Sequence, residues 1–264
     1  MSETAGAGMV RVAINSDAMF LIPEADPYWT ADWAKGGYEQ DMTWLLRRAA
    51  DRPYALFDAG ANYGYWSILA SSAPFGGHSA IAIEPCRTNF EILLHNAAAN
   101  SNRFQTLRRA CLDETGKRAT LYGTKHYGLS LRTDWHPDDV GQFEDVETIT
   151  LDDVADRYLP ERSHPALVKI DVEGSEIAAM RGARKLIGEG ALIAYEDHGK
   201  EAEHPATRFV LSLADVDLWH VGADNQPTRI TAIGQMNEIK TDPKAGYNLF
   251  FCRNTSPWTS AFKG

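Results

Sequence analysis

Short apolar stretches alternate with longer amphipathic ones along the middle of the chain. Continuously apolar stretches that end in small or acidic residues predict buried strands, and the segments between them place apolar residues at helical spacing. Strands that alternate with helices indicate β-α-β units and a parallel sheet covered on both faces. We expect core strands over 55–60, 79–85, 104–110, 166–174 and 191–199, helices over 65–72, 89–99 and 206–213, and a further helix that ends at residue 187.

The two ends of the chain depart from this rhythm. Residues 10–14 and 18–22 flank three polar residues, which predicts a hairpin, and a helix is expected over 42–50. Near the C-terminus the last strand patterns follow one another without a helix, which predicts an antiparallel edge. The predicted fold class is a doubly wound α/β fold with a mostly parallel sheet and an antiparallel C-terminal edge. Further strands are expected over 118–123, 146–151, 216–221, 228–233 and 247–253.

An aromatic segment rich in Pro and Gly joins the hairpin to the first helix. Its rings could cover the crevice as a lid and offer a π-face to a cation. They could also pack as a small core under the hairpin, which is the interpretation we favour. We therefore divide the chain into a hairpin and lid extension over 1–50 and a main domain over 51–264. The aromatic residues are Tyr28, Trp29, Trp33 and Tyr38.

Composition and charge narrow the class of partners. With 264 residues, 44% hydrophobic and 23% charged, the chain is typical of soluble globular proteins. Its net charge of −10 argues against nucleic acid and against an acidic membrane surface as partners. Residues 134–157 alone hold nine acids and one arginine, so the rest of the chain is nearly neutral. A negatively charged small molecule therefore stays open as a ligand.

The cysteines and the N-terminus indicate a cytoplasmic setting. Cys86, Cys111 and Cys252 stand far apart, and no C-x-x-C occurs, which favours reduced thiols. The first residues lack the charged and apolar regions of a signal peptide. No stretch approaches the ~18 apolar residues that a membrane span needs.

The strongest local signal is the strand–turn–helix motif FDAGANYGYWS at residues 57–67. Gly60 allows a sharp turn, and the helix that follows offers free N–H groups. Asn62 replaces the middle glycine of a dinucleotide motif, and Asp58 suits a cationic or zwitterionic ligand better than a pyrophosphate. Glu84, at the end of the next strand, is placed to accept hydrogen bonds from both hydroxyls of a ribose. The alternatives are a generic turn with packing glycines and a solvated glutamate.

Acidic residues also end the fourth and fifth core strands. Asp171 closes an apolar strand at the crevice edge, where open α/β sheets bind ligands. Strand alternation places Glu196 and His198 on one side of the next strand, where a histidine can act as a base near neutral pH. His198 fits a surface loop equally well, and Glu173 and Glu176 fit as acids that offset a helix dipole. A metal site built from Asp171, Glu196 and His198 is a weaker alternative, and we expect no metal.

Taken together and in order, these motifs resemble the FkbM-type family of S-adenosylmethionine-dependent methyltransferases. The resemblance spans roughly residues 36–197, and the combination is far more specific than any single motif. Ala59 and Tyr63 stand where aliphatic residues are common in the family, and the C-terminal part matches only in outline. The matching segments are GGYE (36–39), FDAGANYGYWS (57–67), AIEP (82–85), HNAAAN (95–100), ITLDDV (149–154) and the segment that begins with VKIDVEGSE (168–186).

The resemblance implies a class I, Rossmann-like methyltransferase with S-adenosyl-L-methionine as its cofactor and residues 51–264 as the catalytic domain. The turn after the first core strand would hold the methionine end, and residues 110–113 would flank the adenine. Asp171 would face the transferred methyl, and Glu39 would touch cofactor or substrate from above. The implied cofactor-binding residues are Glu39, Asp58, Gly60, Asn62, Gly64, Ser67, Glu84, Pro85, Cys111, Asp113 and Asp171.

The family's usual product is a methyl ether, so the implied reaction is O-methylation of a hydroxylated small molecule in secondary metabolism. The acceptor would be a sugar, a nucleotide sugar or a polyketide-like compound, and a homo-oligomer stays open. An alcohol nucleophile gains typically ~10²–10⁴-fold from a base. Our candidate base is His198, supported by Glu196 or Asp171, because the reference pKa of imidazole lies nearest neutral.

Three other functions share parts of this pattern. An NAD-dependent oxidoreductase would use the same turn and the same acidic residue for its ribose. This sequence, however, lacks the glycine motif of dinucleotide-binding proteins. Methylation of a small-molecule amine would suit an acidic crevice. A non-catalytic nucleotide-binding module would bind the cofactor without turnover.

Overall fold

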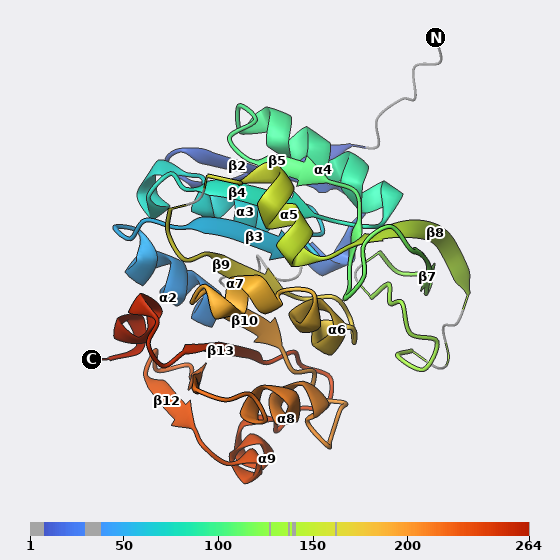
Figure 1. Ribbon diagram of the computed structural model, residues 1–264. Coiled ribbons are helices and arrows are strands. Elements are labelled where there is room, and N and C mark those ends of the chain that lie inside the picture. Colours follow the sequence, from blue (N-terminus) through green and yellow to red (C-terminus); the bar gives the residue numbers. More distant parts are fainter. Residues whose placement is uncertain are drawn as a thin grey trace.

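The computed structural model describes most of the chain, and an eight-stranded sheet runs through its centre (Figure 1). Each strand of this sheet lies within or close to a predicted strand. The expected strand over 104–110 is shorter, because the chain leaves the sheet after residue 107. Trp33, Gly36 and Gly37 lie outside the described residues. The described residues are 8–29, 38–126, 128–136, 138, 141–161 and 163–263.

The sheet is parallel on one side and antiparallel on the other. Its strands are β3 (Ala55–Ala59), β4 (Ser79–Ile83), β5 (Gln105–Leu107), β9 (Leu167–Ile170), β10 (Leu192–Glu196), β11 (Val216–Val221), β12 (Pro227–Ile230) and β13 (Asn248–Arg253). The order is β12-β11-β13-β10-β9-β3-β4-β5. Strands β10, β9, β3, β4 and β5 are mutually parallel, and β13, β11 and β12 pair antiparallel. The predicted antiparallel C-terminal edge is thus confirmed.

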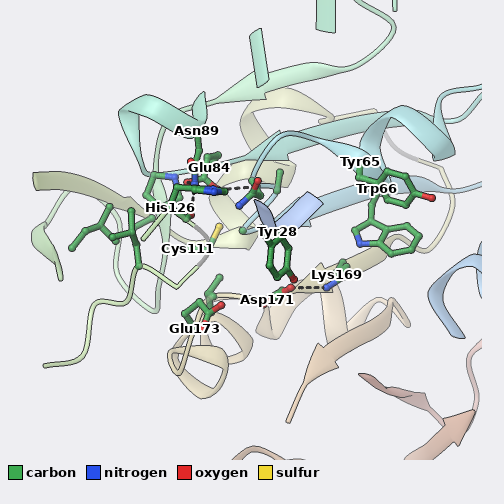
Figure 2. A pocket seen from close by; sticks show the side chains of 18 of the residues that line it. Tyr28, Tyr65, Trp66, Glu84, Asn89, Cys111, His126, Lys169, Asp171 and Glu173 are labelled. Atoms are coloured by element: carbon green, nitrogen blue, oxygen red, sulfur yellow. Dashed lines mark hydrogen bonds and ion pairs between the residues drawn. The ribbon is translucent and has the colours of Figure 1, made fainter. Parts of the chain in front are cut away.

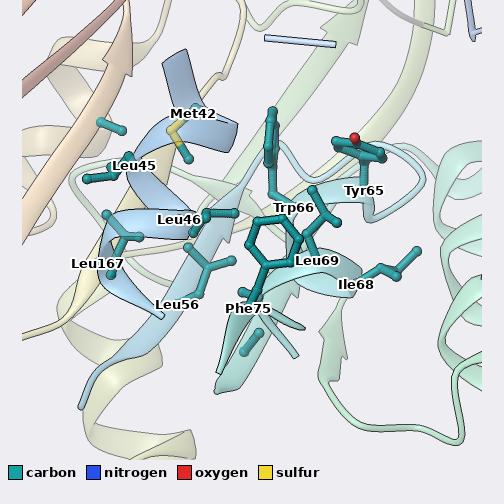
Figure 3. Packing of buried hydrophobic residues seen from close by; sticks show 14 of the residues in the cluster. Met42, Leu45, Leu46, Leu56, Tyr65, Trp66, Ile68, Leu69, Phe75 and Leu167 are labelled. Carbon is teal, nitrogen blue, oxygen red and sulfur yellow. The ribbon is translucent and has the colours of Figure 1, made fainter. Parts of the chain in front are cut away.

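Helices cover both faces of the sheet, because successive strand side chains point to opposite faces. On β3, Leu56 belongs to one hydrophobic cluster and Phe57 to a second. The first cluster contains side chains of α2 (Gln40–Ala49), α3 (Tyr65–Ala70) and α4 (Arg87–Ala99). Figure 3 shows Leu45 and Leu46 of α2 packed near Leu56. The second cluster contains side chains of α5 (Leu151–Tyr158), α6 (Glu176–Arg181), α7 (Arg184–Gly188), α8 (Pro205–Leu211) and α9 (Met236–Ile239).

The helix expected to end at residue 187 is broken into α6 and α7. The break falls at Gly182, whose carbonyl accepts a hydrogen bond from Asp152 N at 2.9 Å. A Cβ at this position would lie 2.1 Å from the carbonyl oxygen of Leu112. The close approach of a neighbouring chain segment therefore requires glycine here.

The predicted hairpin is confirmed as β1 (Met9–Asn15) and β2 (Ala18–Pro23), and two asparagines of α4 hold it. The Asn96 amide accepts from Leu21 N at 2.7 Å and donates to Leu21 O at 3.0 Å. Asn100, one helical turn later, pairs in the same way with Met19 N and O. The side chains of α4 thus satisfy the backbone of β2, and this explains part of the HNAAAN motif.

A smaller three-stranded sheet lies beyond β5, in the order β6-β8-β7. It consists of β6 (Ala110–Cys111), β7 (Arg118–Tyr122) and β8 (Gln142–Ile149), around a small cluster that includes Cys86 and Leu121. The three cysteines of the chain are buried and form no disulfide. Across the residues that the structure describes, no helix is long and apolar enough for a membrane span.

Candidate functional site

A cleft opens at the carboxyl ends of β3, β4 and β9; we call it the inner cleft (Figure 2). The chain passes from β3 to β4 on one side and returns to β9 on the other, so the strand order reverses here. Open α/β sheets bind ligands at such a switch point. Figure 2 shows Glu84 and Asn89 on one side and Lys169 and Asp171 on the other, with Tyr28 between them.

The turn after β3 forms the floor of the inner cleft. Gly60 has φ of 82°, and a Cβ there would lie 1.7 Å from the carbonyl oxygen of Asp171. The loops that follow β3 and β9 can therefore meet only at a glycine. Gly64 begins α3 and faces Leu93 of α4, so it serves helix packing and does not line the cleft.

Asp58 and Ser67 lie beneath this turn, buried, and do not line the cleft. The Asp58 carboxylate accepts hydrogen bonds from Ser67 N at 3.2 Å and Ser67 Oγ at 2.8 Å. Burial raises the pKa of Asp58 to about 6, and these two hydrogen bonds oppose the shift. The pair fixes the start of α3 to the end of β3.

Glu84 is the buried acid of the inner cleft, which it lines together with Asn62 and Pro85. One carboxylate oxygen accepts from Asn62 N at 2.8 Å, and the other accepts from Cys86 N at 2.9 Å. Burial raises the pKa of Glu84 to about 7. Asn89 lies beside it with a buried Oδ1 that accepts no hydrogen bond from the described residues. The cleft therefore presents fixed acceptors to a ligand rich in hydroxyl and amino groups.

The segment expected to flank an adenine is only partly at the cleft. Ala110 and Cys111 are buried and line it, whereas Asp113 is exposed and is not among its lining residues. The turn after β6 carries Asp113 away from the sheet edge.

Lys169 is a buried lysine that lines the inner cleft, and the carboxylates of Glu39, Asp171 and Glu196 lie around it. Lys169 Nζ lies 3.0 Å from Asp171 Oδ2 and 3.4 Å from Glu39 Oε2. Burial by itself lowers the pKa of Lys169, but Asp171 and Glu39 outweigh this effect and raise it. Burial raises the pKa of Glu39 to about 7, and that of Glu196 well above its ordinary range. We call the space between them the carboxylate hollow, lined by Tyr28, Tyr38, Glu39, Asp171, Glu173, Glu196 and Gly246.

Sequence reasoning assigned no role to Lys169. The signal was present, because a lysine in the middle of an otherwise apolar, fully buried strand needs a charged partner. Its partners come from three separate segments of the chain, which only the fold brings together.

Glu196 and His198 share one side of the chain, as strand alternation predicts, and line a third space, which we call the outer hollow. Asp197 points the other way and pairs with Lys240 at 2.5 Å. The expected near-neutral pKa of His198 is not found: burial, Lys200 and Lys240 lower it to about 4. The imidazole is therefore a weak base. This outer hollow is lined by Tyr28, Lys125, Gly128, His136, Asp138, Glu173, Glu196, His198, Lys244 and Gly246.

Tyr28, Trp29 and Tyr38 pack as part of a hydrophobic core, as favoured above, and they also line the inner cleft. Trp29 is 3% exposed and belongs to the main hydrophobic cluster, yet it lines the inner cleft together with Tyr28 and Tyr38. The rings of Trp29 and Tyr38 lie 4.8 Å apart. Core packing thus holds aromatic faces at the cleft wall.

A network of polar contacts that the sequence did not predict lies beside the inner cleft. Tyr63 Oη donates to Asp26 Oδ2 at 2.9 Å, and His126 Nε2 lies 3.1 Å from the same oxygen. Asn89 Nδ2 donates to the carbonyl of His126 at 2.8 Å. These contacts tie the segment after β7 to the N-terminal extension. Within the described ranges, no group of three or more His, Cys, Asp or Glu residues is arranged to hold a metal ion.

The chain is similar to known methyltransferases. A family model described as the methyltransferase FkbM domain matches residues 58–216. Among solved structures, an FkbM methyltransferase from Methylobacillus flagellatus KT is 18% identical, with a TM-score of 0.47; the match covers 75% of this chain and 43% of that one. An O-methyltransferase from Bacillus cereus, in complex with SAH, is 13% identical, with a TM-score of 0.45; the match covers 84% of this chain and 86% of that one. No curated protein matches the chain.

Proposed function

We propose that this chain, which belongs to the methyltransferase FkbM family, transfers the methyl group of S-adenosyl-L-methionine to a hydroxyl oxygen of a small molecule. The observation that supports this most is the position of Glu84. It is a buried acid at the switch point of the sheet, anchored by two backbone N–H groups, in a cleft that shares Asp171 and Glu173 with the carboxylate hollow. A nucleoside and a charged reacting centre would thus find matching groups in adjoining spaces.

The residues of the inner cleft fit this cofactor. Glu84 Oε1 accepts from both Cys86 N and Asn89 Nδ2, whereas Oε2 accepts only from Asn62 N and keeps a lone pair for a ribose hydroxyl. Asn89 Oδ1 is an unused acceptor. The aromatic faces of Tyr28 and Tyr38, with the nearby carboxylates, suit a sulfonium cation. We assign the turn at Gly60 and Asn62 to the methionine end and Cys111 to the edge of the adenine. Asp58 and Ser67 would support that turn from below, and Asp113 has no contact to offer.

The chemistry places few demands on the protein beyond position and charge. When bound, the cofactor supplies a methyl carbon already activated by its positive sulfur, so the residues must align the acceptor and receive its proton. Asp171 lines both the inner cleft and the carboxylate hollow, which suits a residue beside the transferred methyl. With a pKa of about 4, His198 is a poor base, so one of the carboxylates of the site is the better candidate.

The outer hollow is the place that we assign to the acceptor. Lys125 and Lys244 face it together with His136, so an acceptor with a negative group, such as a nucleotide sugar, would find counter-charges there. A neutral sugar or polyketide-like compound would rely on the polar lining. The carboxylates would also attract an amine, and for this reason amino sugars belong in the test. The unpaired buried cysteines support a reducing compartment such as the cytoplasm.

Calorimetry followed by an acceptor screen tests the proposal. We expect S-adenosylhomocysteine to bind and NAD not to bind; binding of NAD alone would contradict it. Sugars, nucleotide sugars, polyketides and matched amino sugars are then offered with S-adenosylmethionine, and products are read by mass spectrometry. A methyl ether supports O-methylation, a methylated amine supports the alternative acceptor, and cofactor binding without any product supports a non-catalytic module.

A further inference from the structure

Glu173 occupies the junction of the three spaces described above. It lines the inner cleft, the carboxylate hollow and the outer hollow, as does Tyr28. Glu196 lines only the two hollows, and His198 lines only the outer one. A group that takes a proton from the acceptor must reach both the acceptor and the methyl donor. Among the carboxylates of the site, Glu173 meets this condition best.

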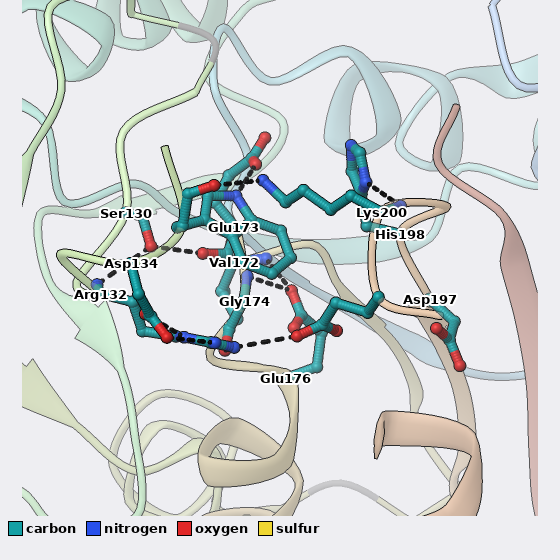
Figure 4. Close-up of polar contacts among 12 residues, drawn as sticks. Ser130, Arg132, Asp134, Val172, Glu173, Gly174, Glu176, Asp197, His198 and Lys200 are labelled. Atoms are coloured by element: carbon teal, nitrogen blue, oxygen red, sulfur yellow. Dashed lines mark hydrogen bonds and ion pairs between the residues drawn. The ribbon is translucent and has the colours of Figure 1, made fainter. Parts of the chain in front are cut away.

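The backbone at Glu173 is held in an unfavourable conformation. Its φ is 50°, in the left-handed region that a glutamate rarely adopts, and Gly174 follows with φ of 94°. Ser130 Oγ donates to the carbonyl of Glu173 at 2.5 Å, and Glu176 Oε1 accepts from Gly174 N at 3.0 Å (Figure 4). Strain of this kind persists only where surrounding contacts enforce it, and it gathers at functional sites.

One side of the Glu173 carboxylate is fixed by a tryptophan. Trp135 Nε1 donates to Glu173 Oε2 at 2.7 Å, and in the described part of the chain no other group donates to this carboxylate. Trp135 is itself clamped, because Lys200 Nζ lies 3.5 Å from its ring centroid and donates to its carbonyl at 2.7 Å. Arg132 stacks on the same ring at 5.3 Å and bonds to Gly174 O. The carboxylate is therefore oriented through one oxygen, and the other is left for a ligand.

The neighbouring acids are engaged differently. Asp171 and Glu39 both pair with Lys169, so the lysine ammonium engages one oxygen of each carboxylate. Glu173 makes no ion pair with Lys169 within hydrogen-bonding range. Burial and the charge of Asp171 raise the pKa of Glu173 to about 8, which suits proton transfer near neutral pH.

We propose that Glu173 is the catalytic base of the methyl transfer and that Trp135 is its positioning residue. The inference rests on the proposed function. In the step, the acceptor oxygen forms a bond to the methyl carbon while the carbon–sulfur bond breaks, and its electron pair stays on sulfur. The hydroxyl proton passes to the free oxygen of Glu173, and the products are a methyl ether and neutral S-adenosylhomocysteine.

Glu173→Gln is the decisive variant, because glutamine keeps the size of the side chain and an oxygen for Trp135. We expect kcat to fall ~10²–10⁴-fold, with S-adenosylhomocysteine affinity changed by less than about threefold. Glu203→Gln, an exposed charge change on the loop before α8, is the matched control and should keep wild-type kcat. Wild-type kcat in Glu173→Gln would overturn the proposal, and so would loss of S-adenosylhomocysteine binding, since Glu173 would then hold the cofactor.

Difference infrared spectroscopy of the protein without cofactor gives a second readout that needs no acceptor. The wild type should show a carboxyl group that titrates near pH 8 and that Glu173→Gln lacks. If Glu173 instead titrates in the ordinary range of glutamate, the proposal is wrong. The groups that act on this titration are Trp135, Asp171, Glu176, Glu196 and Lys200. The other charged or titratable side chains that line the outer hollow with Glu173 are Lys125, His136, Asp138, His198 and Lys244.

Trp135→Phe tests whether Trp135 orients the Glu173 carboxylate or only packs beside it. Removing the indole N–H should lower kcat about 10-fold at pH 7 and shift the acidic limb of the pH profile upward, since the carboxylate loses a donor. A rate lowered equally at every pH would show a merely structural role and contradict the assignment. If the wild type methylates no acceptor, the proposed function itself fails; if it does and Glu173→Gln matches it, only this inference fails.

Discussion

The inner cleft and the outer hollow share a wall at Tyr28 and Glu173 but are built in different ways. The floor and acid of the cleft come from turns directly after β3 and β4, and backbone hydrogen bonds such as Asn62 N to Glu84 fix them. The outer hollow is formed by loops far apart in the sequence, which contribute Lys125, His198 and Lys244 among others. The inner cleft is thus preorganised by the sheet, whereas the outer hollow depends on how distant loops meet.

Gly60→Ala should produce the largest effect, because it changes the turn that forms the floor of the inner cleft. The new Cβ would lie 1.7 Å from the Asp171 carbonyl, so we expect a loss of about 3 kcal/mol of unfolding free energy and of S-adenosylhomocysteine binding. Gly116→Ala is the matched control, since its φ of 77° is similar but nothing lies within 4 Å. It should lose only about 1 kcal/mol. If urea denaturation shows equal losses of unfolding free energy for the two variants, the positive φ of the glycine accounts for the effect, and the contact between the two loops does not.

Glu84→Gln tests the acid of the cleft without removing its bulk. S-adenosylhomocysteine affinity should fall about 10- to 100-fold, because charge-assisted hydrogen bonds to two hydroxyls become weaker or are lost. Glu91→Gln, at an exposed position on α4, is the control and should bind normally in the same calorimetric titration. Unchanged affinity in Glu84→Gln would place the ribose elsewhere.

The two regions should together make stability depend on pH. The folded-state pKa is raised to about 7 for Glu39, Glu84 and Glu176 and to about 8 for Glu173, all above the unfolded value of 4.5. The native state then holds the extra protons, so stability falls as pH rises toward these values. The lowered pKa of His198 has the opposite sign but acts only below pH 6.5.

We therefore expect the unfolding free energy to decline between pH 6.5 and 8, by about 1 kcal/mol for each of the four carboxyls. Urea denaturation at several pH values measures this slope. The slope should be shallower in Glu84→Gln and in Glu173→Gln. A free energy that stays level or rises across the window would show that these carboxyls ionise normally.

His198→Ala should have the smallest effect. Because its imidazole is neutral and weakly basic, kcat should change by only a few fold between pH 6 and 9. A loss comparable to that of Glu173→Gln would restore His198 as the base. The comparison of these two variants at saturating cofactor therefore decides which group on the acceptor side carries the proton.

Much of the cofactor side could be predicted from the sequence, because each of its signals is local. An apolar strand followed by Gly60, and another followed by Glu84, place both residues at the carboxyl edge of a parallel sheet. Asp113 shows the limit of such reasoning, since one exposed turn separates it from Cys111 at the cleft. Likewise, a glycine read as part of a helix, Gly182, breaks it because a distant carbonyl approaches.

The outer hollow could not be predicted to the same degree. Glu173 looked like an acid that offsets a helix dipole, whereas its carboxylate accepts a hydrogen bond from Trp135, which lies in a different loop. His198 was expected to titrate near neutral pH, but burial and two lysines lower its pKa. A pKa reflects every charge and every desolvated atom nearby, and these come from segments far apart in the chain.

The sequence by itself determined the alternation of strands and helices, the turn chemistry at Gly60 and the acids at the strand ends. These depend on periodicity and on neighbours along the chain. Only the tertiary structure decided that Lys169 pairs with Glu39 and Asp171, and that Glu173 lines both the inner cleft and the outer hollow. The physical reason is that Coulomb interactions and burial act through space, and residues distant in sequence become neighbours only when the sheet has formed.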